Sequence, residues 1–377
     1  MKKHQLAAMI LSALSAGVLI SCSKPNDDIQ NTVADSESKA KPASDASNTK
    51  TTQVQAIDIA PDTAAQYAKH VTDTQILTSY QDVVAQSQKL NELATKQCAL
   101  NTTIEAAELQ QLQEQWLNLA KAWARAEIIN FGPAMDSMSN LYINYYPDER
   151  GLVHQGVIDL IEANPSLTAE QLASESAIVQ GIPGLEEVLF SNKTLTDQQC
   201  QYVQSTSEAL TARLENVLEA WKENPESLMG MEEGSRKTGM NYWINSILSL
   251  VETTKSSSLD QPLGITGNKK GHLPAQAAGQ SREIITAKVA SLNKALTDVQ
   301  LVTILNEGGQ DSIANELSTV LSETSSLLAE MPEDIATDTP ENQKALYDKL
   351  TELTQLIKHQ LMPALGVQVG FNSTDGD

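Results

Sequence analysis

The chain has 377 residues, with 26 lysines and arginines against 48 aspartates and glutamates, which gives a formal net charge of −22 at pH 7. A surface this acidic repels the phosphates of nucleic acids and of anionic lipids, which argues against a nucleic-acid-binding function. It is compatible with attraction of cations, although most of the carboxylates should simply be solvated. The length is sufficient for two ordinary domains in addition to a leader and a linker.

The first residues are typical of a bacterial signal peptide. Lys2 and Lys3 give a positive start, and the apolar stretch Leu6 to Ile20 that follows is too short for a comfortable membrane span. We therefore expect residues 1–21 to be a signal peptide that is removed from the mature protein.

A lipid anchor is predicted at Cys22. This cysteine ends the tetrapeptide Leu19-Ile20-Ser21-Cys22, which resembles a lipobox, where the chain is cut before the cysteine and the thiol is lipidated. Several acyl chains on one residue are enough for stable membrane anchoring. Ser23, where an aspartate would retain the protein at the inner membrane, favours the outer membrane by resemblance to Gram-negative sorting signals. An ordinary signal peptide with a chance cysteine is the alternative.

Residues 22–58 contain almost no large apolar side chains. Such a segment cannot bury enough surface to offset the loss of chain entropy on folding. We expect a disordered tether that holds a periplasm-facing body away from the membrane.

From residue 59 onward the dominant pattern is helical, with apolar residues recurring at spacings of three to five. A helix is expected to begin within Ser166–Glu170, and the amphipathic stretches include Leu109–Trp123, Val153–Ile161, Leu210–Trp221, Met240–Val251, Ile284–Leu296, Ile313–Leu328 and Leu346–Leu356. Strands do not alternate with helices, so the sequence predicts an all-α fold built from two helical bundles. We place an N-terminal bundle at residues 59–180 and a C-terminal bundle at residues 181–377.

Two cysteines remain besides Cys22, and they are Cys98 and Cys200. An even pair in an oxidising compartment predicts a disulfide bond. The bond would close a loop of roughly 100 residues and stabilise the fold by about 4 kcal/mol in the chain-entropy model. Two buried free thiols are the alternative. A zinc site is disfavoured, because neither cysteine has a second cysteine or a histidine at ligand spacing.

The sequence lacks several catalytic motifs. It contains no HExxH, HxxE or HxxEH pattern, no P-loop, no strand-linked GxGxxG and no GxSxG nucleophile elbow. We expect the histidines beyond the leader to be surface or partly packed residues, and these are His70, His154, His272 and His359. The tryptophans lie in helical stripes, where core packing is expected, and these are Trp116, Trp123, Trp221 and Trp243.

One segment stands out, Gln180-Gly181-Ile182-Pro183-Gly184-Leu185-Glu186-Glu187. Gly181 permits an unusual turn, and Pro183 suits the first turn of a helix. Glu186 and Glu187 would then lie near a helix N-terminus, where negative charge is favourable. A plain helix start between two domains is the alternative interpretation.

This segment resembles the motif region of the imelysin-like family, also classed as M75 peptidases, whose hallmark is GxHxxE. Gly181 and Glu186 match, whereas Pro183 stands in place of the histidine, so the variant GxPxxE resembles a proteobacterial lipoprotein branch. Other stretches agree in order along the chain, and they are Trp123 with Phe131-Gly132-Pro133, Tyr146-Pro147-Asp148, Leu259–Gly264, the ending Gly370–Asp377, and the pair Cys98 and Cys200.

The resemblance implies two bundles related by duplication, with the motif segment in a cleft between them. It also implies a link to bacterial iron acquisition and, in some members, a peptidase activity. Glu186 carries over from the family motif, but the histidine does not, because proline has no ligand atom. In the loop after Pro274, only Ser281 is kept from a Glu-Ser-x-x-Ser run of the family.

We therefore expect a non-catalytic envelope lipoprotein associated with iron or another metal, together with an envelope iron-uptake partner. Glu186 would be the central ligand in the cleft, with Glu187, Asp148 and Asp375 as helpers. Oxygen ligands suit ferric iron or calcium. Three alternatives stay open: a metallopeptidase, which needs three ligands and a base; a cleft that binds a peptide or small molecule without metal; and a partner-binding scaffold.

Overall fold

The computed structural model describes residues 54–98, 104–231 and 236–370, and every regular element in these ranges is a helix. The all-α prediction is therefore confirmed for this part of the chain. None of the described helices is long and apolar enough to cross a membrane. The predicted signal peptide at residues 1–21, the predicted anchor Cys22, most of the predicted tether and the predicted ligand Asp375 lie outside the described residues.

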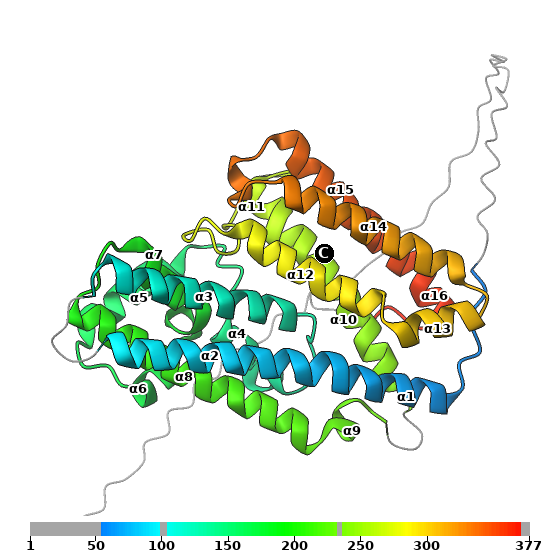
Figure 1. Cartoon of the computed structure of the whole chain (residues 1–377), viewed down its shortest axis with the longest axis horizontal. Coiled ribbons are helices and arrows are strands. Elements are labelled where there is room, and N and C mark those ends of the chain that lie inside the picture. The colour runs from blue at the N-terminus through cyan, green and yellow to red at the C-terminus, as the bar shows by residue number, and fades with distance from the viewer. Residues whose placement is uncertain (1–53, 99–103, 232–235, 371–377) are drawn as a thin grey trace, which may run out of the picture. The chain divides into compact units, whose positions relative to one another are not determined.

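Within the described ranges, the first half of the chain contains three long helices joined by short ones (Figure 1). Residues 61–97 run without a break through a π-helical turn, so α1, η1 and α2 form one rod. The elements are α1 Pro61–Val71, η1 Thr72–Ile76, α2 Leu77–Gln97, α3 Ala106–Ala126, η2 Gly132–Ala134, η3 Asp136–Met138, α4 Ser139–Ile143, α5 Leu152–Ala163, α6 Ala169–Ala173, η4 Ala177–Val179, α7 Gly181–Ser191, α8 Asp197–Glu223 and α9 Pro225–Leu228.

The described part of the second half contains four long helices, and an extended loop at residues 264–280 separates the first of them from the second. The elements are α10 Thr238–Lys255, η5 Ser256–Asp260, α11 Gln261–Leu263, α12 Ser281–Leu296, α13 Val299–Glu307, α14 Asp311–Glu330, η6 Ile335–Thr337, α15 Pro340–Leu356, η7 Ile357–Leu361 and α16 Met362–Leu365.

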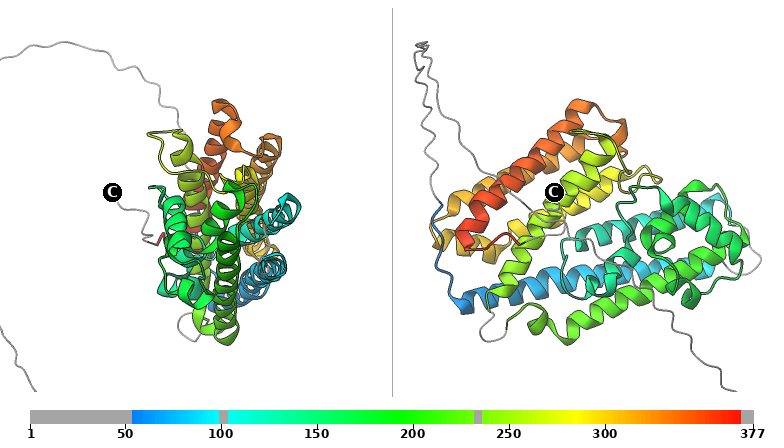
Figure 2. Two further views of the ribbon diagram at one scale, coloured as in Figure 1. Left: turned by 90° about the vertical axis from the view of Figure 1, so that its left-hand side faces the viewer. Right: turned by 180° about the vertical axis from the view of Figure 1, so that it is seen from behind.

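Two groups of helices pack side by side (Figures 1 and 2). In one group α2 lies against α3 and α8, and α7 contacts α3, α5 and α8. In the other group α10 packs on α15, and α14 packs on both α12 and α15. Contacts between α3 and α12 join the groups. The predicted boundary at residue 181 coincides with the start of α7, which packs with the helices before it; the division into two domains stays a prediction.

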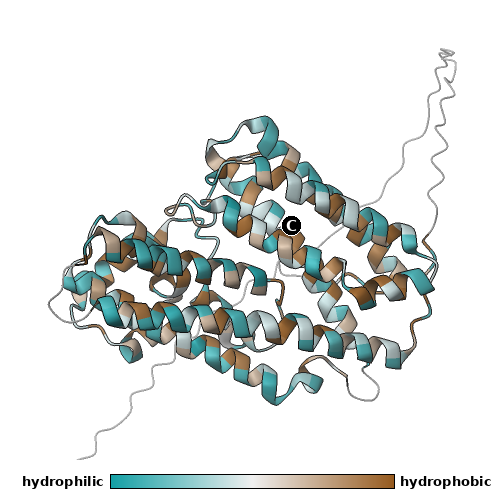
Figure 3. Cartoon of the chain, viewed as in Figure 1, coloured by the Kyte–Doolittle hydropathy of each residue, from teal (hydrophilic) through white to brown (hydrophobic). Residues whose placement is uncertain are grey.

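The apolar stripes of the helices face one another, and the polar faces point outward (Figure 3). The four tryptophans are buried as predicted, with Trp116, Trp221 and Trp243 at most 1 % exposed and Trp123 at 5 %. Each large side chain removed from water in this way contributes roughly 2–3 kcal/mol to folding before the entropy loss is counted. A smaller cluster around Leu259, Ile285 and Leu350 forms a second core among α12, α14 and α15.

The disulfide prediction is also confirmed, since Cys98 at the end of α2 is bonded to Cys200 in the first turn of α8. The bond spans 102 residues of sequence. A β-bridge between Ile104 and Leu195 joins the segments next to the two cysteines. The covalent link therefore closes the end of the group formed by α2, α3 and α8.

Gly181 begins α7 with a φ angle of +69°, in the left-handed region that favours glycine. A β-carbon at this position would also collide with the backbone carbonyl oxygens of Tyr142 and Ile143 at the end of α4. Two constraints therefore require glycine at position 181: the positive backbone angle and the close approach of α4. This contact fixes where α7 starts and so where the acidic residues of the motif lie.

We predict that Gly181→Ala destabilises the protein much more than Gly151→Ala. Gly151 has a similar φ angle of +65°, but nothing lies within 4 Å of a β-carbon built there. The matched variant should show only the backbone penalty of about 1–2 kcal/mol. Gly181→Ala should lose about 2 kcal/mol more through overpacking. Urea unfolding of both variants measures the difference, and equal losses would mean that the approach of α4 is unimportant.

Candidate functional site

Glu186 lies in the second turn of α7 and is held by the loop that precedes α12. Its Oε1 atom accepts hydrogen bonds from the backbone N–H groups of Ala277 at 2.9 Å and Ala278 at 3.3 Å. Ala275, two residues earlier, has a φ angle of +51°, an uncommon conformation for a residue other than glycine. Such strain is kept only where the surroundings fix it, and it often marks a functional site. The loop thus presents two successive donors to one carboxylate oxygen.

Burial raises the pKa of Glu186 to about 7. The two N–H donors of the loop pull the pKa down and the charge of Glu187 pushes it up, but the loss of hydration dominates. This carboxyl group is therefore divided between its neutral and charged forms near pH 7. It accepts hydrogen bonds in the charged form, and it also donates one in the neutral form.

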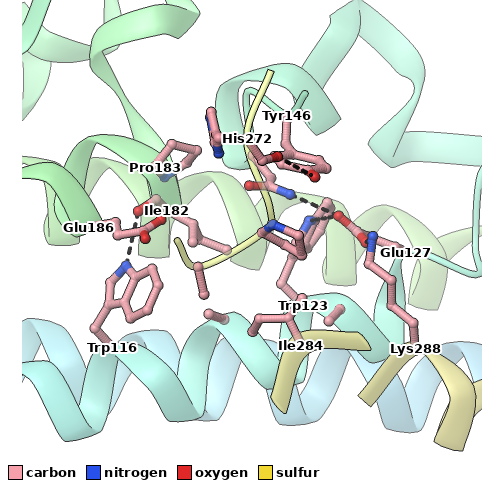
Figure 4. Close-up of a pocket in the computed structure, with 15 residues that line it drawn as sticks. Trp116, Trp123, Glu127, Tyr146, Ile182, Pro183, Glu186, His272, Ile284 and Lys288 are labelled. Carbon is pink, nitrogen blue, oxygen red and sulfur yellow. Dashed lines mark hydrogen bonds and ion pairs between the residues drawn. The ribbon is translucent and has the colours of Figure 1, made fainter. Parts of the chain in front are cut away.

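A pocket with largely aromatic and apolar walls lies on one side of Glu186 (Figure 4). We call it the central pocket; its cavity volume is about 40 Å³, and the figure reaches about 440 Å³ only when all empty space up to its open mouth is counted. Trp116 and Trp123 of α3 form its floor, and the Trp116 Nε1–H group donates to the Ile182 carbonyl oxygen at 2.9 Å. Its other lining residues include Ala120, Asn144, Tyr146, Pro183, Pro274, Ile284 and Lys288. The hydrogen bond from Trp116 pins the start of α7 on α3.

The end of the central pocket away from Glu186 carries a buried ion pair. Lys288 of α12 lies 2.8 Å from an oxygen of Glu127, and their side chains are 5 % and 19 % exposed. The other oxygen of Glu127 accepts hydrogen bonds from Trp123 Nε1 at 3.0 Å and Asn144 Nδ2 at 2.8 Å. Lys288 also donates to Ser258 Oγ at 3.2 Å. Both charges of the pair are therefore compensated within the protein, as burial requires.

Tyr146 closes one wall of the central pocket. Its hydroxyl group lies 2.9 Å from the Ser257 carbonyl oxygen and 3.0 Å from that of His272, and can donate to either. Burial raises the pKa of Tyr146, so its phenol stays protonated at physiological pH. The ring packs edge-on to the His272 ring at a centroid distance of 5.6 Å. Tyr146 is therefore an uncharged lining residue, and its hydroxyl group contacts both the loop and η5.

A second, polar pocket lies on the other side of Glu186, with about 660 Å³ of empty space including its opening. We call it the outer pocket, and its ionisable residues are Asp148, His154, Glu186, Glu187 and His272. Glu187 Oε1 lies 2.8 Å from His154 Nδ1 and accepts from Ser191 Oγ at 2.8 Å. Three residues line both pockets, namely Pro183, Glu186 and His272. They form the wall between the central and outer pockets.

The structure brings together most of the predicted motif residues but not all of them. Pro183, Glu186, Glu187 and Asp148 share the outer pocket, although Asp148 is far from the motif in sequence. Ser281 does not line either pocket. Its buried hydroxyl oxygen accepts the N–H of Ile335 at 2.9 Å and ties α12 to η6.

Sequence reasoning missed the two histidines of the outer pocket and the ion pair of the central pocket. His154 is a surface residue and His272 a partly packed one, as expected, but the sequence did not indicate that both line the pocket of Glu186. Lys288 lies in the amphipathic stretch Ile284–Leu296. The spacing of residues in this stretch does not indicate that Lys288 contacts Glu127 at the end of α3. Only the approach of α12 to α3 reveals these contacts.

The described residues do not fit a resident metal centre. No group of three or more His, Cys, Asp or Glu side chains among them is arranged to hold a metal ion. One oxygen of Glu186 is bound to the loop backbone, and Pro183 offers no ligand atom. The predicted set of Glu186, Asp148 and Asp375 is incomplete here, because its third member lies outside the described residues.

We predict that Glu186→Gln makes stability less dependent on pH between 5 and 8. The folded pKa of about 7 lies above the ordinary 4.5, so stabilisation is full below pH 4.5 and is lost as the pH rises through 7. At about 1.4 kcal/mol per unit, the loss approaches 3 kcal/mol. Urea unfolding at pH 5 and pH 8 measures it. Glu330→Gln, at an exposed position of α14 outside both pockets, is the matched control, and an unchanged slope in Glu186→Gln would contradict the assignment.

Comparison with known proteins agrees with the geometry. The family model described as Imelysin (Peptidase_M75) matches residues 76–360. An imelysin-like protein from Psychrobacter arcticum 273-4 is 54 % identical, with 84 % of this chain and 100 % of that chain covered and a TM-score of 0.83. A protein named as an iron-regulated protein A precursor, from Parabacteroides distasonis ATCC 8503, shares the fold at 12 % identity, with 81 % and 96 % covered and a TM-score of 0.65. No match is found among curated proteins. The chain belongs to the imelysin family.

Proposed function

We propose that this protein is an exported, non-catalytic binding protein of the bacterial cell envelope, in which the central and outer pockets beside Glu186 hold a small organic ligand. The observation that carries the proposal is the position of the Glu186 carboxyl group in the wall between the pockets. Its Oε1 atom is fixed by the loop backbone, and Oε2 has no hydrogen-bond partner within the described part of the chain.

The composition of the central pocket supports a small ligand rather than an ion. Ligand sites in proteins are concave and mostly apolar, with a few polar groups that set orientation. Here Trp116, Trp123 and Ile284 supply apolar surface, while Glu186 and the Lys288 ion pair mark the two ends (Figure 4). A ligand between these ends would be oriented by its polar group.

The described residues give little support to hydrolysis, the main alternative. A metallopeptidase needs a metal held by about three ligands and an activated water. Pro183 replaces the motif histidine, and the described side chains provide no three-ligand group. The hydroxyl of Ser281 is occupied in holding η6.

The proposed connection to iron rests on a relative and not on a metal site. The protein from Parabacteroides distasonis that shares this fold is named as iron-regulated and as a precursor. We propose that the present chain is also exported, in agreement with the predicted leader and the predicted lipid anchor at Cys22. We further propose that its production responds to iron and that it acts with an envelope iron-uptake partner.

We predict that a fragment mixture of small acids, amines and alcohols, screened by ligand-observed NMR, contains binders of the wild-type protein. Ala120→Leu should weaken them at least tenfold, because Ala120 lines the central pocket and is 5 % exposed. Ala329→Leu at an exposed position of α14 is the matched control, because Ala329 lines neither pocket. Circular dichroism checks the folding of both variants. Binding of no fragment, or binding indifferent to Ala120→Leu, would contradict the proposal.

We also predict that the amount of the protein in its own cells rises when iron is withheld with a chelator and falls when iron is restored. Quantitative immunoblotting of envelope fractions measures this, with an unrelated lipoprotein as the loading control. Equal amounts under both conditions would remove the connection to iron and would leave the binding function untouched.

A further inference from the structure

We propose that the ligand of these pockets is a primary amine on a compact apolar group, with its ammonium in the outer pocket and its apolar part in the central pocket. The proposal rests on the binding function proposed above and names its ligand class. The following contacts lead to it.

The outer pocket has the charge that an ammonium ion needs. Its ionisable lining is Asp148, Glu186, Glu187 and two histidines, and no lysine or arginine of the described residues lines it. His154 and Ser191 both contact Oε1 of Glu187, which leaves its Oε2 atom without a partner in the described part of the chain. Asp148 and Glu186 each keep one oxygen without a hydrogen-bond partner among the described residues.

Asp148 supplies a second carboxylate to the outer pocket, and one of its oxygens lacks a hydrogen-bond donor in the described part of the chain. Asp148 is only 3 % exposed, and its Oδ2 atom accepts the N–H of Val153 at 2.9 Å, at the start of α5. Its Oδ1 atom is buried without a partner among the described residues. A buried carboxylate oxygen in this state is destabilising unless a donor fills the site. Because solvent does not reach this oxygen, an N–H donor of a ligand in the outer pocket would meet it only after the Asp148 side chain turns.

His272 offers a third acceptor. Its Nδ1 atom lies 2.9 Å from the Leu273 carbonyl oxygen, which can only accept, so Nδ1 carries the proton. In the neutral ring Nε2 is then an acceptor. An ammonium group has three donors and makes hydrogen bonds of about 2.8 Å, longer than the 2.0–2.6 Å of metal–oxygen bonds. Acceptors that do not form a metal site can therefore still surround an ammonium group.

The central pocket selects what is attached to the nitrogen. Beyond the wall formed by Pro183, Glu186 and His272, the lining is apolar up to the ion pair of Lys288 and Glu127. An alkyl chain would lie on Trp116, Trp123 and Ile284 (Figure 4). A second ammonium at the far end would meet the Lys288 ammonium. The pocket should therefore prefer a monoamine to a diamine of equal length.

An ammonium beside Glu186 also favours the charged form of its carboxyl group. Because burial holds the pKa of Glu186 at about 7, binding below pH 7 should release a proton, and affinity should rise from pH 5 to pH 8. His154, His272, Asp148 and Glu187 face the same pocket.

The test is calorimetric titration of the wild-type protein with methylamine, n-butylamine and n-hexylamine, at pH 6 in two buffers of different ionisation enthalpy. Burial of three more methylene groups should tighten n-butylamine at least tenfold over methylamine, since each contributes about fourfold. At pH 6 the binding enthalpies measured in the two buffers should differ. The difference should equal the difference in ionisation enthalpy of the buffers multiplied by the number of protons released, which is at most one. n-Butanol and 1,4-diaminobutane should bind at least tenfold more weakly than n-butylamine.

The variants Glu186→Gln and Asp148→Asn should each weaken n-butylamine at least tenfold. Glu149→Gln is the matched control, because Glu149 pairs with Lys270 at 2.8 Å and does not line the outer pocket. Equal binding of n-butanol, or full binding by Glu186→Gln, would overturn the proposal. If acids or alcohols bind with sensitivity to Ala120→Leu and amines do not, the amine proposal fails and the binding function stands.

A free amine and the amino terminus of a peptide present the same ammonium. Leu-Ala-Ala amide distinguishes these sources. Binding of n-butylamine together with the peptide supports an amine site that is open to peptide termini, and binding of n-butylamine alone supports a closed site for free amines.

Discussion

The arrangement of the site depends on the bond between the Glu186 carboxylate and two successive N–H groups of the loop before α12. This contact joins α7, which packs with α3 and α8, to a segment that leads into the second group of helices. It fixes the loop over the motif, and it places His272 and Pro274 in the lining of the central pocket. The same contact leaves the second carboxylate oxygen for something other than the protein. Because the group is buried, its pKa lies near neutrality, so its charge responds to whatever enters the pocket.

The two ends of the central pocket differ in how their buried charges are compensated. At the Lys288 end a lysine, a glutamate and their hydrogen-bond donors satisfy one another, so burial is compensated within the chain. At the Glu186 end three carboxylates face no lysine or arginine of the described residues, and one oxygen of each has no hydrogen-bond partner there. A protein keeps such uncompensated groups at the expense of stability, and binding sites are where this imbalance is common.

The departure from the family motif has a local physical meaning. Proline at position 183 removes an imidazole and adds a rigid apolar surface to the wall between the pockets. Histidines return to the site from elsewhere, since His272 comes from the loop and His154 from α5. Gly181, the glycine of the motif, keeps its role, because α4 approaches its backbone too closely for a side chain. The backbone requirements of the motif have thus been kept while its side-chain chemistry has changed.

The sequence by itself determined the helical class, most helix positions and the burial of the four tryptophans, because periodicity, caps and proline stops act over a few residues. It also determined the pairing of Cys98 with Cys200, because these are the two cysteines besides Cys22. The helix predicted around Val153–Ile161 and the start predicted within Ser166–Glu170 correspond to α5 and to α6 with its Thr168 cap. Gly181, Pro183 and Glu186 were also recognisable, since they are close in sequence. Only the tertiary structure decided that Lys288 meets Glu127, that His272 and Asp148 join Glu186, and that Ser281 does not. These contacts depend on how α12 and its loop pack on α3 and α7, and no spacing within a single helix encodes that approach.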